Sequence, residues 1–194
     1  MAQTDEIIIE THPFPPFLPE GARVLMMGTF PPGEHRWSMN FYYPNPINDY
    51  WRICGMLFLG DRDALYDTVK KSFREEECRR LMTKHHIAMH DTAREVRRLK
   101  GNASDKFLEI LTPVPLFELL KEIPECHTIA STGEKAADII AELTGTQRPK
   151  MGEMTESSDG LRIWRMPSTS RAYPMKIEKK AEYYAELFRS VGIL

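Results

Sequence analysis

The chain has 194 residues, of which 42% are hydrophobic and 28% are charged, so it can bury the core of one globular domain. Its formal net charge of −2 excludes a chain that is basic throughout, so a nucleic-acid surface would need local clusters of Lys and Arg. The three cysteines are too few for a four-cysteine iron–sulfur cluster and suit a reducing compartment. We therefore expect a single cytoplasmic domain over residues 1–194.

The chain begins with a Pro-rich arm, residues 1–22, that leads into the domain. The arm begins acidic, and no stretch approaches the ~18 consecutive apolar residues of a membrane span, so we expect no signal peptide and no membrane contact. Residues 22–30, ARVLMMGTF, are apolar and run into two prolines, which predicts a buried strand. The loop that follows, residues 28–51, is rich in proline, aromatic rings and asparagine.

Two helical patterns come next along the chain. Residues 48–60 space their apolar side chains as a helix does, with Asn48 as a candidate N-cap. A longer pattern over residues 64–85 predicts a second helix. Residues 87–96 begin apolar and turn polar at His90, so we expect a strand to end there.

Strands and helices continue to alternate toward the C-terminus. We predict helices over residues 112–123, 133–145 and 176–190, and strands over residues 127–132 and 161–167. This alternation predicts an α/β layer fold with a mainly parallel sheet. Because ligands of such folds bind at the carboxyl ends of the strands, the loops that follow the strands are the candidates for a site.

The first of these loops contains GTFPPG, which is not a phosphate loop. It lacks the Gly-Lys-Ser/Thr ending, and proline has no N–H to donate to a phosphate. Its prolines make a stiff wall instead, and Phe41, Tyr42 and Tyr43 can stack on a planar ligand. The same rings can also fill the core, and Asn48 can face a ligand or merely cap its helix, so these alternatives stay open.

The second and third loops carry the charged and hydroxyl groups. Asp91, at the end of its strand, can accept an N–H from a ring or cap the next helix. The pair His85 and His86 has no partner set for zinc, so we expect no metal. The third loop, PSTSRAYP, has hydroxyls suited to phosphate contacts, and residues 161–180 carry a local charge of +5. That basic run fits a polyanion, although a solvated face is an alternative.

These segments resemble motifs of the uracil-DNA glycosylase superfamily, most closely its mismatch-specific and hypoxanthine-type branches. LMMGTFPPG is similar to the first motif, a strand followed by Gly-x-x-Pro-Gly, with an extra proline. YYPNPINDYW resembles Tyr-Tyr-x-x-Pro-x-Asn-x-Phe-Trp of the hypoxanthine-type branch, with Tyr50 in place of Phe. MPSTSRAYPMKIEKKAEYYAELF is similar to the last motif of that branch, Pro-Ser-Thr-Ser before a lysine-bearing amphipathic helix. The likeness spans roughly residues 22–190.

The resemblance implies a three-layer α/β/α fold around a central, mostly parallel four-stranded sheet. It also implies an enzyme of base excision repair that flips a deaminated base, uracil or hypoxanthine, out of DNA and hydrolyses its N-glycosidic bond. The DNA can be a damaged duplex or a single strand. We expect a monomer that needs neither a metal nor a cofactor.

The resemblance further implies roles for individual residues. In many branches an acid or amide after the first-motif glycine positions the water, but here that residue is Thr29, which cannot act as a base at neutral pH. The role then passes to Asn48, which can orient a water but cannot take its proton, so we expect slow chemistry. The base would stack on Tyr43, and Asp91 would accept an N–H from its edge.

Two groups of contacts complete this expectation. The wall beneath the base is expected from Gly28, Thr29, Phe30 and Pro31. Contacts with DNA are expected from Ser168, Thr169, Ser170, Arg171, Tyr173 and Lys176. Arg171 or Tyr173 would wedge into the gap that the flipped base leaves.

Two other functions stay open at this point. The absence of an acid at Thr29 also fits a non-catalytic nucleic-acid-binding protein on the same fold. A nucleotide- or nucleoside-processing α/β enzyme that never binds a polymer is the second alternative.

Overall fold

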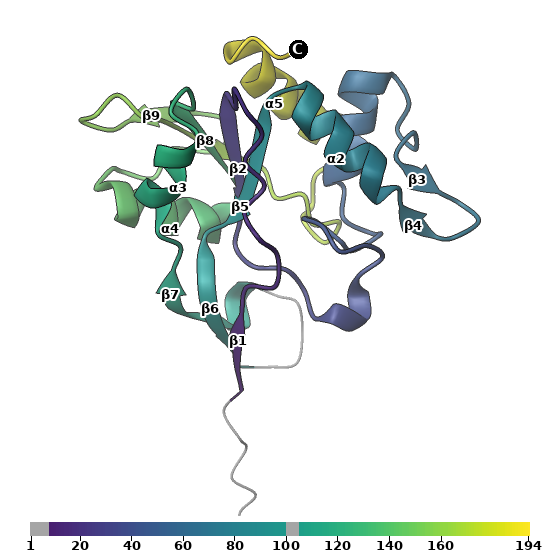
Figure 1. Ribbon diagram of the computed structural model, residues 1–194, viewed down its shortest axis with the longest axis horizontal. Coiled ribbons are helices and arrows are strands. Elements are labelled where there is room, and N and C mark those ends of the chain that lie inside the picture. Colours follow the sequence, from purple (N-terminus) through teal and green to yellow (C-terminus); the bar gives the residue numbers. More distant parts are fainter. Residues whose placement is uncertain (1–7, 100–104) are drawn as a thin grey trace, which may run out of the picture.

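A five-stranded sheet forms the centre of the molecule, in the strand order β5-β2-β8-β10-β9. The computed structural model describes residues 8–99 and 105–194 (Figure 1). Four neighbouring strands are parallel, and β9 at the edge is antiparallel to β10. The strands are β2 (Val24–Gly28), β5 (Ile87–Asp91), β8 (Thr128–Thr132), β9 (Met154–Glu156) and β10 (Arg162–Met166). The predicted α/β class with a central, mostly parallel sheet is confirmed, and β9 adds an edge strand.

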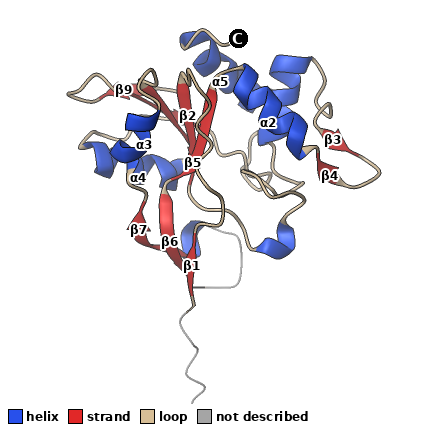
Figure 2. Ribbon diagram, viewed as in Figure 1, coloured by secondary structure: helices blue, strands red, loops and turns tan. Residues whose placement is uncertain are grey.

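Helices cover both faces of this sheet, as Figure 2 shows. They are α1 (Tyr50–Cys54), α2 (Glu75–Lys84), α3 (Leu116–Glu122), α4 (Glu134–Thr144) and α5 (Ile177–Ser190). Alternate residues of β2 belong to different apolar clusters: Met26 packs in the cluster of α1, α2 and α5, and Leu25 in that of α3 and α4. Every residue of β2 and β5 is buried, because parallel strands are covered on both faces. The three-layer arrangement follows from this alternation.

Two smaller antiparallel sheets flank the centre (Figure 1). One consists of β1 (Ile9–Thr11), β6 (Ala93–Arg98) and β7 (Leu108–Pro113), and the other of β3 (Tyr66–Asp67) and β4 (Ser72–Phe73). Because β1 pairs with β6, and Phe17 bridges to Met89 of β5, the arm packs against the domain from residue 9 onward. The arm is therefore part of the fold and not only a segment that leads into it.

The helix predicted over residues 64–85 is wrong in its first half. Residues 66–73 form the β3–β4 hairpin, and α2 begins only at Glu75. Asp67 Oδ1 accepts the backbone N–H groups of Val69 and Lys70, and Lys71 has a positive φ of 54°, so the chain reverses here. Val69 is 89% exposed, so the apolar spacing that suggested a helix was accidental.

Other boundaries differ less. The helix predicted over residues 112–123 starts at Leu116, because β7 extends to Pro113. The helix predicted over residues 48–60 is present as α1 followed by a π-helical turn, Gly55–Leu59. The predicted strands near residues 127–132 and 161–167 and the predicted helices near 133–145 and 176–190 are confirmed. Within the described ranges, no helix is long and apolar enough to span a bilayer.

A buried ion pair joins α5 to the chain before α1. Lys180 Nζ donates to Asp49 Oδ2 and to the carbonyl of Ser170, both at 2.8 Å, and the side chain of Lys180 is fully buried. The backbone N–H of Asp49 donates to the carbonyl of Thr169 at 2.8 Å. Lys180, which belongs to the basic run of residues 161–180, is thus a structural cation and not part of a surface.

We expect Lys180→Met to lower the free energy of unfolding by about 3 kcal/mol, because the buried Asp49 carboxylate loses its closest partner and is left with the half-exposed Arg171, at 3.5 Å. Urea unfolding followed by circular dichroism measures the change. The matched control is Lys179→Met, since Lys179 is exposed and pairs with Glu182 at the surface. The unfolding midpoint of this control should hardly move, and an equal loss in both variants would contradict the role of the buried pair.

Candidate functional site

A cleft of 680 Å³ lies at the carboxyl ends of β2, β5, β8 and β10. It is bounded by the loop after β2, the end of β5, the end of β8 and the loop after β10, as expected for a parallel α/β sheet. The candidate residues that line it are Gly28, Thr29, Phe30, Pro31, Tyr43, Asn48, Asp91, Ser168, Thr169, Ser170, Arg171 and Tyr173. Lys176 is exposed at the N-terminus of α5 and does not line the cleft. The fold therefore brings together segments far apart in the sequence.

Three polar side chains converge above Gly28 on the cleft floor. A Cβ atom at this position would lie 2.7 Å from Asp91 Oδ1 and 3.5 Å from both Thr132 Oγ1 and the Tyr43 hydroxyl. The hydroxyls of Tyr43 and Thr132 are themselves 2.9 Å apart. Residue 28 must be glycine for the Asp91 carboxylate to lie this close to the backbone. Thr132 was not among the predicted site residues.

Asp91 has a partner that the sequence did not indicate. His12 Nε2 lies 2.9 Å from Asp91 Oδ2, and the two side chains are 4% and 8% exposed. The His12 ring is enclosed by other rings, edge-on to Phe30 at 5.4 Å between centroids and 4.8 Å from His90. Nothing in the spacing of the Pro-rich arm indicates this contact, because it depends on the pairing of β1 with β6.

The Tyr43 ring is held in an unusual backbone conformation. Its φ is 52°, and its ring stacks on Tyr50 with centroids 4.2 Å apart and planes 18° apart. One face is therefore covered by Tyr50. Burial raises the pKa of Tyr43 well above its usual value, and the nearby Asp91 carboxylate raises it further, so the phenol keeps its proton. Tyr43 thus brings a hydroxyl donor to the cleft floor.

Asn48 lines the cleft and bonds to the first residue of α1, whereas the N-cap position predicted for Asn48 is occupied by Asp49. Asn48 Oδ1 accepts the backbone N–H of Tyr50 at 2.9 Å, and the residue is half-buried in the cleft wall. Arg52 fixes this loop, because its Nη1 donates to the carbonyls of Pro46 at 2.6 Å and of Asn48 at 3.4 Å. The bond to Tyr50 does not prevent Asn48 from facing a ligand, since its amide oxygen has a second lone pair.

The loop after β10 is shaped by its own hydroxyls. Ser168 Oγ accepts the N–H of Ser170 at 3.2 Å, and Ser170 Oγ accepts the N–H of Ala172 at 3.3 Å. Thr169 is 2% exposed, and Arg171 Nε lies 3.5 Å from Asp49 Oδ1. Ser168 and Ser170 can still donate their hydroxyl protons to a ligand. Thr169 is buried, so little of its surface is accessible to a ligand.

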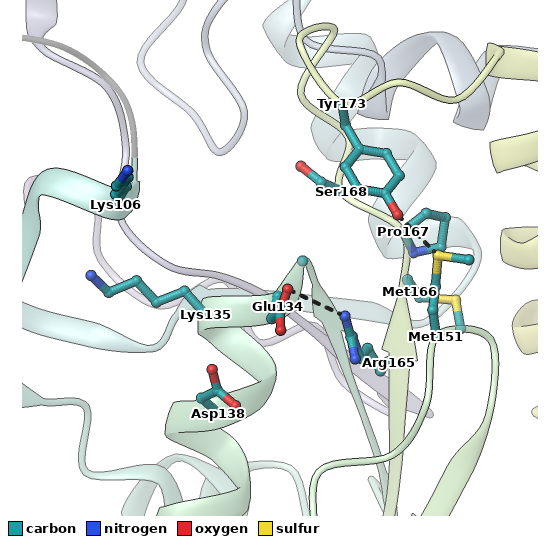
Figure 3. Close-up of a pocket in the computed structure, with 11 residues that line it drawn as sticks. Lys106, Glu134, Lys135, Asp138, Met151, Arg165, Met166, Pro167, Ser168 and Tyr173 are labelled. Atoms are coloured by element: carbon teal, nitrogen blue, oxygen red, sulfur yellow. Dashed lines mark hydrogen bonds and ion pairs between the residues drawn. The ribbon is translucent and has the colours of Figure 1, made fainter.

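Two further hollows adjoin the cleft. A side pocket of 520 Å³ shares Ser168 and Tyr173 with it. Figure 3 shows Lys106 and Lys135 at one side of this pocket and Arg165 beside Glu134, its partner at 3.6 Å. A basic groove of 440 Å³ shares Arg36, Asn45 and Ile47 with the cleft, and its lining has no Asp or Glu. Its positive residues are Arg36, Lys70 and Lys71, with His35 beside them. The sequence did not indicate this groove.

The chain resembles known proteins in sequence and in fold. It is 25% identical over 126 residues to the hypoxanthine DNA glycosylase of Methanosarcina barkeri, a match that covers 64% of this chain and 72% of the relative. A solution NMR structure from Methanosarcina acetivorans, described as "a putative Uracil DNA glycosylase", matches with a TM-score of 0.63 at 20% identity. This match covers 95% of this chain and 99% of the other and shows that the two share a fold. No family model matches the chain.

These findings confirm the resemblance to the uracil-DNA glycosylase superfamily and to its hypoxanthine-type branch. Among residues 8–99 and 105–194, no group of three or more His, Cys, Asp or Glu side chains is arranged to hold a metal ion.

We expect Gly28→Ala to lower the free energy of unfolding by about 1–3 kcal/mol, because the new methyl group would collide with Asp91 Oδ1. The double variant Gly28→Ala, Asp91→Ala removes the obstacle. In a double-mutant cycle measured by urea unfolding, the glycine substitution should cost less in the Asp91→Ala background. Equal costs in both backgrounds would show that the contact does not constrain residue 28.

Proposed function

We propose, from a fold and motifs that resemble those of the uracil-DNA glycosylase superfamily, that this protein is a DNA glycosylase that excises a deaminated base, hypoxanthine or uracil. The observation that carries this proposal is the Asp91 carboxylate over Gly28, in the same cleft as Asn48. The names of the similar proteins, a hypoxanthine DNA glycosylase and "a putative Uracil DNA glycosylase", support it.

A carboxylate on the cleft floor suits a deaminated base. Deamination of adenine or cytosine changes a ring nitrogen from a hydrogen-bond acceptor into an N–H donor. Asp91 Oδ1 can only accept, so it favours N1–H of hypoxanthine or N3–H of uracil over the lone pair of an undamaged adenine or cytosine. The Tyr43 and Thr132 hydroxyls lie beside it and share one hydrogen bond, so one of the two keeps a proton to donate to the adjacent ring carbonyl. A base must leave the duplex to reach these groups.

The ring of the base needs an apolar surface, and Phe30 is well placed to provide one. Phe30 lines the cleft directly after the floor residues and is supported behind by the His12 ring. Tyr43, which the sequence suggested for stacking, already has one face on Tyr50. We therefore assign stacking to Phe30, a contact of about 1–3 kcal/mol per base, and assign the Tyr43 hydroxyl to the edge of the base.

Hydrolysis breaks the bond between the base and C1′ of the sugar. The base leaves with the bonding electron pair, a water adds to C1′, and the proton that this water loses passes through solvent to the departed base. Positive charge develops on the sugar and negative charge on the leaving base, so the donors that face the base stabilise the transition state. We assign the orientation of the water to Asn48, through its amide. Neither Thr29 nor Asn48 can take the proton at neutral pH, and the negative charge of Asp91 opposes that of the leaving base. Turnover is therefore expected to be slow.

The DNA backbone would lie across the rim of the cleft. Ser168 and Ser170 can donate to phosphate oxygens, and the exposed Arg171 and Lys176 stand beside them. The basic groove adjoins the cleft at Arg36, Asn45 and Ile47 and adds positive charge to its rim. Arg171 and Tyr173 remain the candidates for the side chain that enters the gap left by the flipped base. The Tyr173 hydroxyl donates to the sulfur of Met151.

We expect wild-type protein to generate abasic sites in duplexes that contain hypoxanthine or uracil, detected as alkali-labile strand breaks. Asn48→Ala should lower the single-turnover rate on the order of 10²-fold, the effect typical of a positioned polar catalytic group. The exposed Asn40 provides the matched control, and Asn40→Ala should retain the wild-type rate. No strand breaks with any deaminated base would refute the enzymatic proposal.

Binding to undamaged DNA should weaken with salt. We expect Arg171→Ala and Lys176→Ala each to reduce the slope of log K against log salt by about one, because each removes one phosphate contact. Fluorescence anisotropy at several salt concentrations measures the slope. Lys121→Ala on α3 is the control, since this exposed lysine pairs with Glu118 and lies outside the cleft. A slope equal to that of the wild type in both variants would place the DNA elsewhere.

A further inference from the structure

His12 lies behind Asp91 and is not used by the proposed reaction. Its Nε2 atom and Asp91 Oδ2 are 2.9 Å apart, and both side chains are more than nine-tenths buried. A carboxylate oxygen can only accept, so Nε2 must carry the proton in this contact. The contact joins the N-terminal arm to the end of β5 on the cleft floor.

The other ring nitrogen of His12 is held by the backbone of Phe14. Nδ1 lies 2.9 Å from the carbonyl oxygen of Phe14 and 3.2 Å from its nitrogen. A protonated Nδ1 can donate to the carbonyl, and an unprotonated Nδ1 can accept from the N–H. In both states Nε2 keeps its proton directed at Asp91. The backbone N–H of His12 donates to the carbonyl of Arg94 at 2.8 Å, which fixes the arm beside β6.

The other titratable groups around Asp91 are engaged elsewhere. His90 Nδ1 donates to the main-chain carbonyl of Asp91 at 2.8 Å, and burial, together with the nearby His12, lowers the pKa of His90. The Tyr42 hydroxyl donates to the carbonyl of Pro15, and burial raises the pKa of Tyr42 far above its usual value. The Tyr43 hydroxyl lies against Thr132. His12 therefore supplies the donor for Oδ2.

We propose that His12 is a positioning residue for base recognition: it holds Oδ2 of Asp91, turns Oδ1 over Gly28 into the cleft, and so limits the cleft to bases with a ring N–H. The inference rests on the proposed function. With Oδ2 held by a donor at both protonation states of the imidazole, Oδ1 is fixed as an acceptor. A base that presents a nitrogen lone pair to Oδ1 is repelled by it and cannot form a hydrogen bond with it.

The test measures binding without requiring cleavage. Duplexes carry a 2′-fluorinated nucleotide, which resists hydrolysis, with either hypoxanthine or 1-methylhypoxanthine as the base. The methyl group removes the N–H, and its steric cost is shared by every variant, so a change in the ratio of Kd values reports the N–H contact. His12→Phe keeps a ring without a donor, and His12→Gln keeps an N–H donor. His127→Phe, at an exposed position, is the control.

We expect the wild type, His12→Gln and His127→Phe to prefer the N–H base, and His12→Phe to lose about tenfold or more of that preference. An unchanged ratio in His12→Phe, or an equal loss in His12→Gln, would overturn the inference. A wild type that prefers the N–H base but cleaves no unmodified lesion would refute the enzymatic proposal alone and leave the inference standing.

A second measurement covers variants that fail to fold. In ¹⁵N-labelled wild type, the Nε2–H signal of His12 should exchange slowly with water, and it should shift in Asp91→Asn. A signal that exchanges freely, or that does not respond to Asp91→Asn, would overturn the pairing on which the inference depends.

Discussion

The buried ammonium group of Lys180 joins the two loops between which the cleft lies. It binds the Asp49 carboxylate beside Asn48 and the Ser170 carbonyl in the hydroxyl loop, while the backbone of Asp49 binds that of Thr169. A buried charge is stable only when its partners are fixed, so the pair imposes one relative position on segments 131 residues apart. The amide assigned to the water and the hydroxyls assigned to phosphate therefore share one rigid support. Such a support suits a reaction that depends on geometry to within a fraction of an ångström.

The cleft floor obeys a second constraint, which is the close approach of a carboxylate to bare backbone. Gly28 leaves room for Asp91 Oδ1, and His12 holds Oδ2 from behind. Aromatic rings surround the pair, so water is kept from competing for it. This combination explains why a Pro-rich arm packs against the strand ends: it carries the donor that a buried carboxylate needs.

The chemistry proposed for this cleft relies on position more than on acid or base strength. Thr29 and Asn48 cannot accept a proton at neutral pH, so the protein would accelerate the reaction by holding the base, the water and the sugar in line. The polar donors near Gly28 would then face the charge that the departing base acquires. The basic groove beside Lys70 and Lys71 extends the positive rim on one side, which matches a polymer better than a free nucleotide.

Much of the fold could be read from the sequence, because apolar spacing reports burial directly. The run at residues 22–30, the strands near residues 127–132 and 161–167, and the helix stopped by Gly145 all formed as predicted. The prediction of a helix over residues 64–85 was wrong in its first half. Two hydrogen bonds to the Asp67 carboxylate stabilise a chain reversal there, which apolar periodicity cannot detect. The sequence analysis also did not predict the small sheet of β1, β6 and β7. Its strands pair with one another, and β1 belongs to the N-terminal arm.

For the site, the sequence by itself determined which residue types lie at the strand ends: Asp91 and the serines follow apolar strands and had to meet at one edge of a parallel sheet, while Asn48 belongs to the long loop after β2. Only the tertiary structure decided what those residues do there. It showed that Asn48 lines the cleft while its side chain accepts the N–H of Tyr50, that Lys180 is buried, and that His12 contacts Asp91. The physical reason is that strand ends follow from local burial, whereas hydrogen-bond partners across 79 or 131 residues depend on how the layers pack.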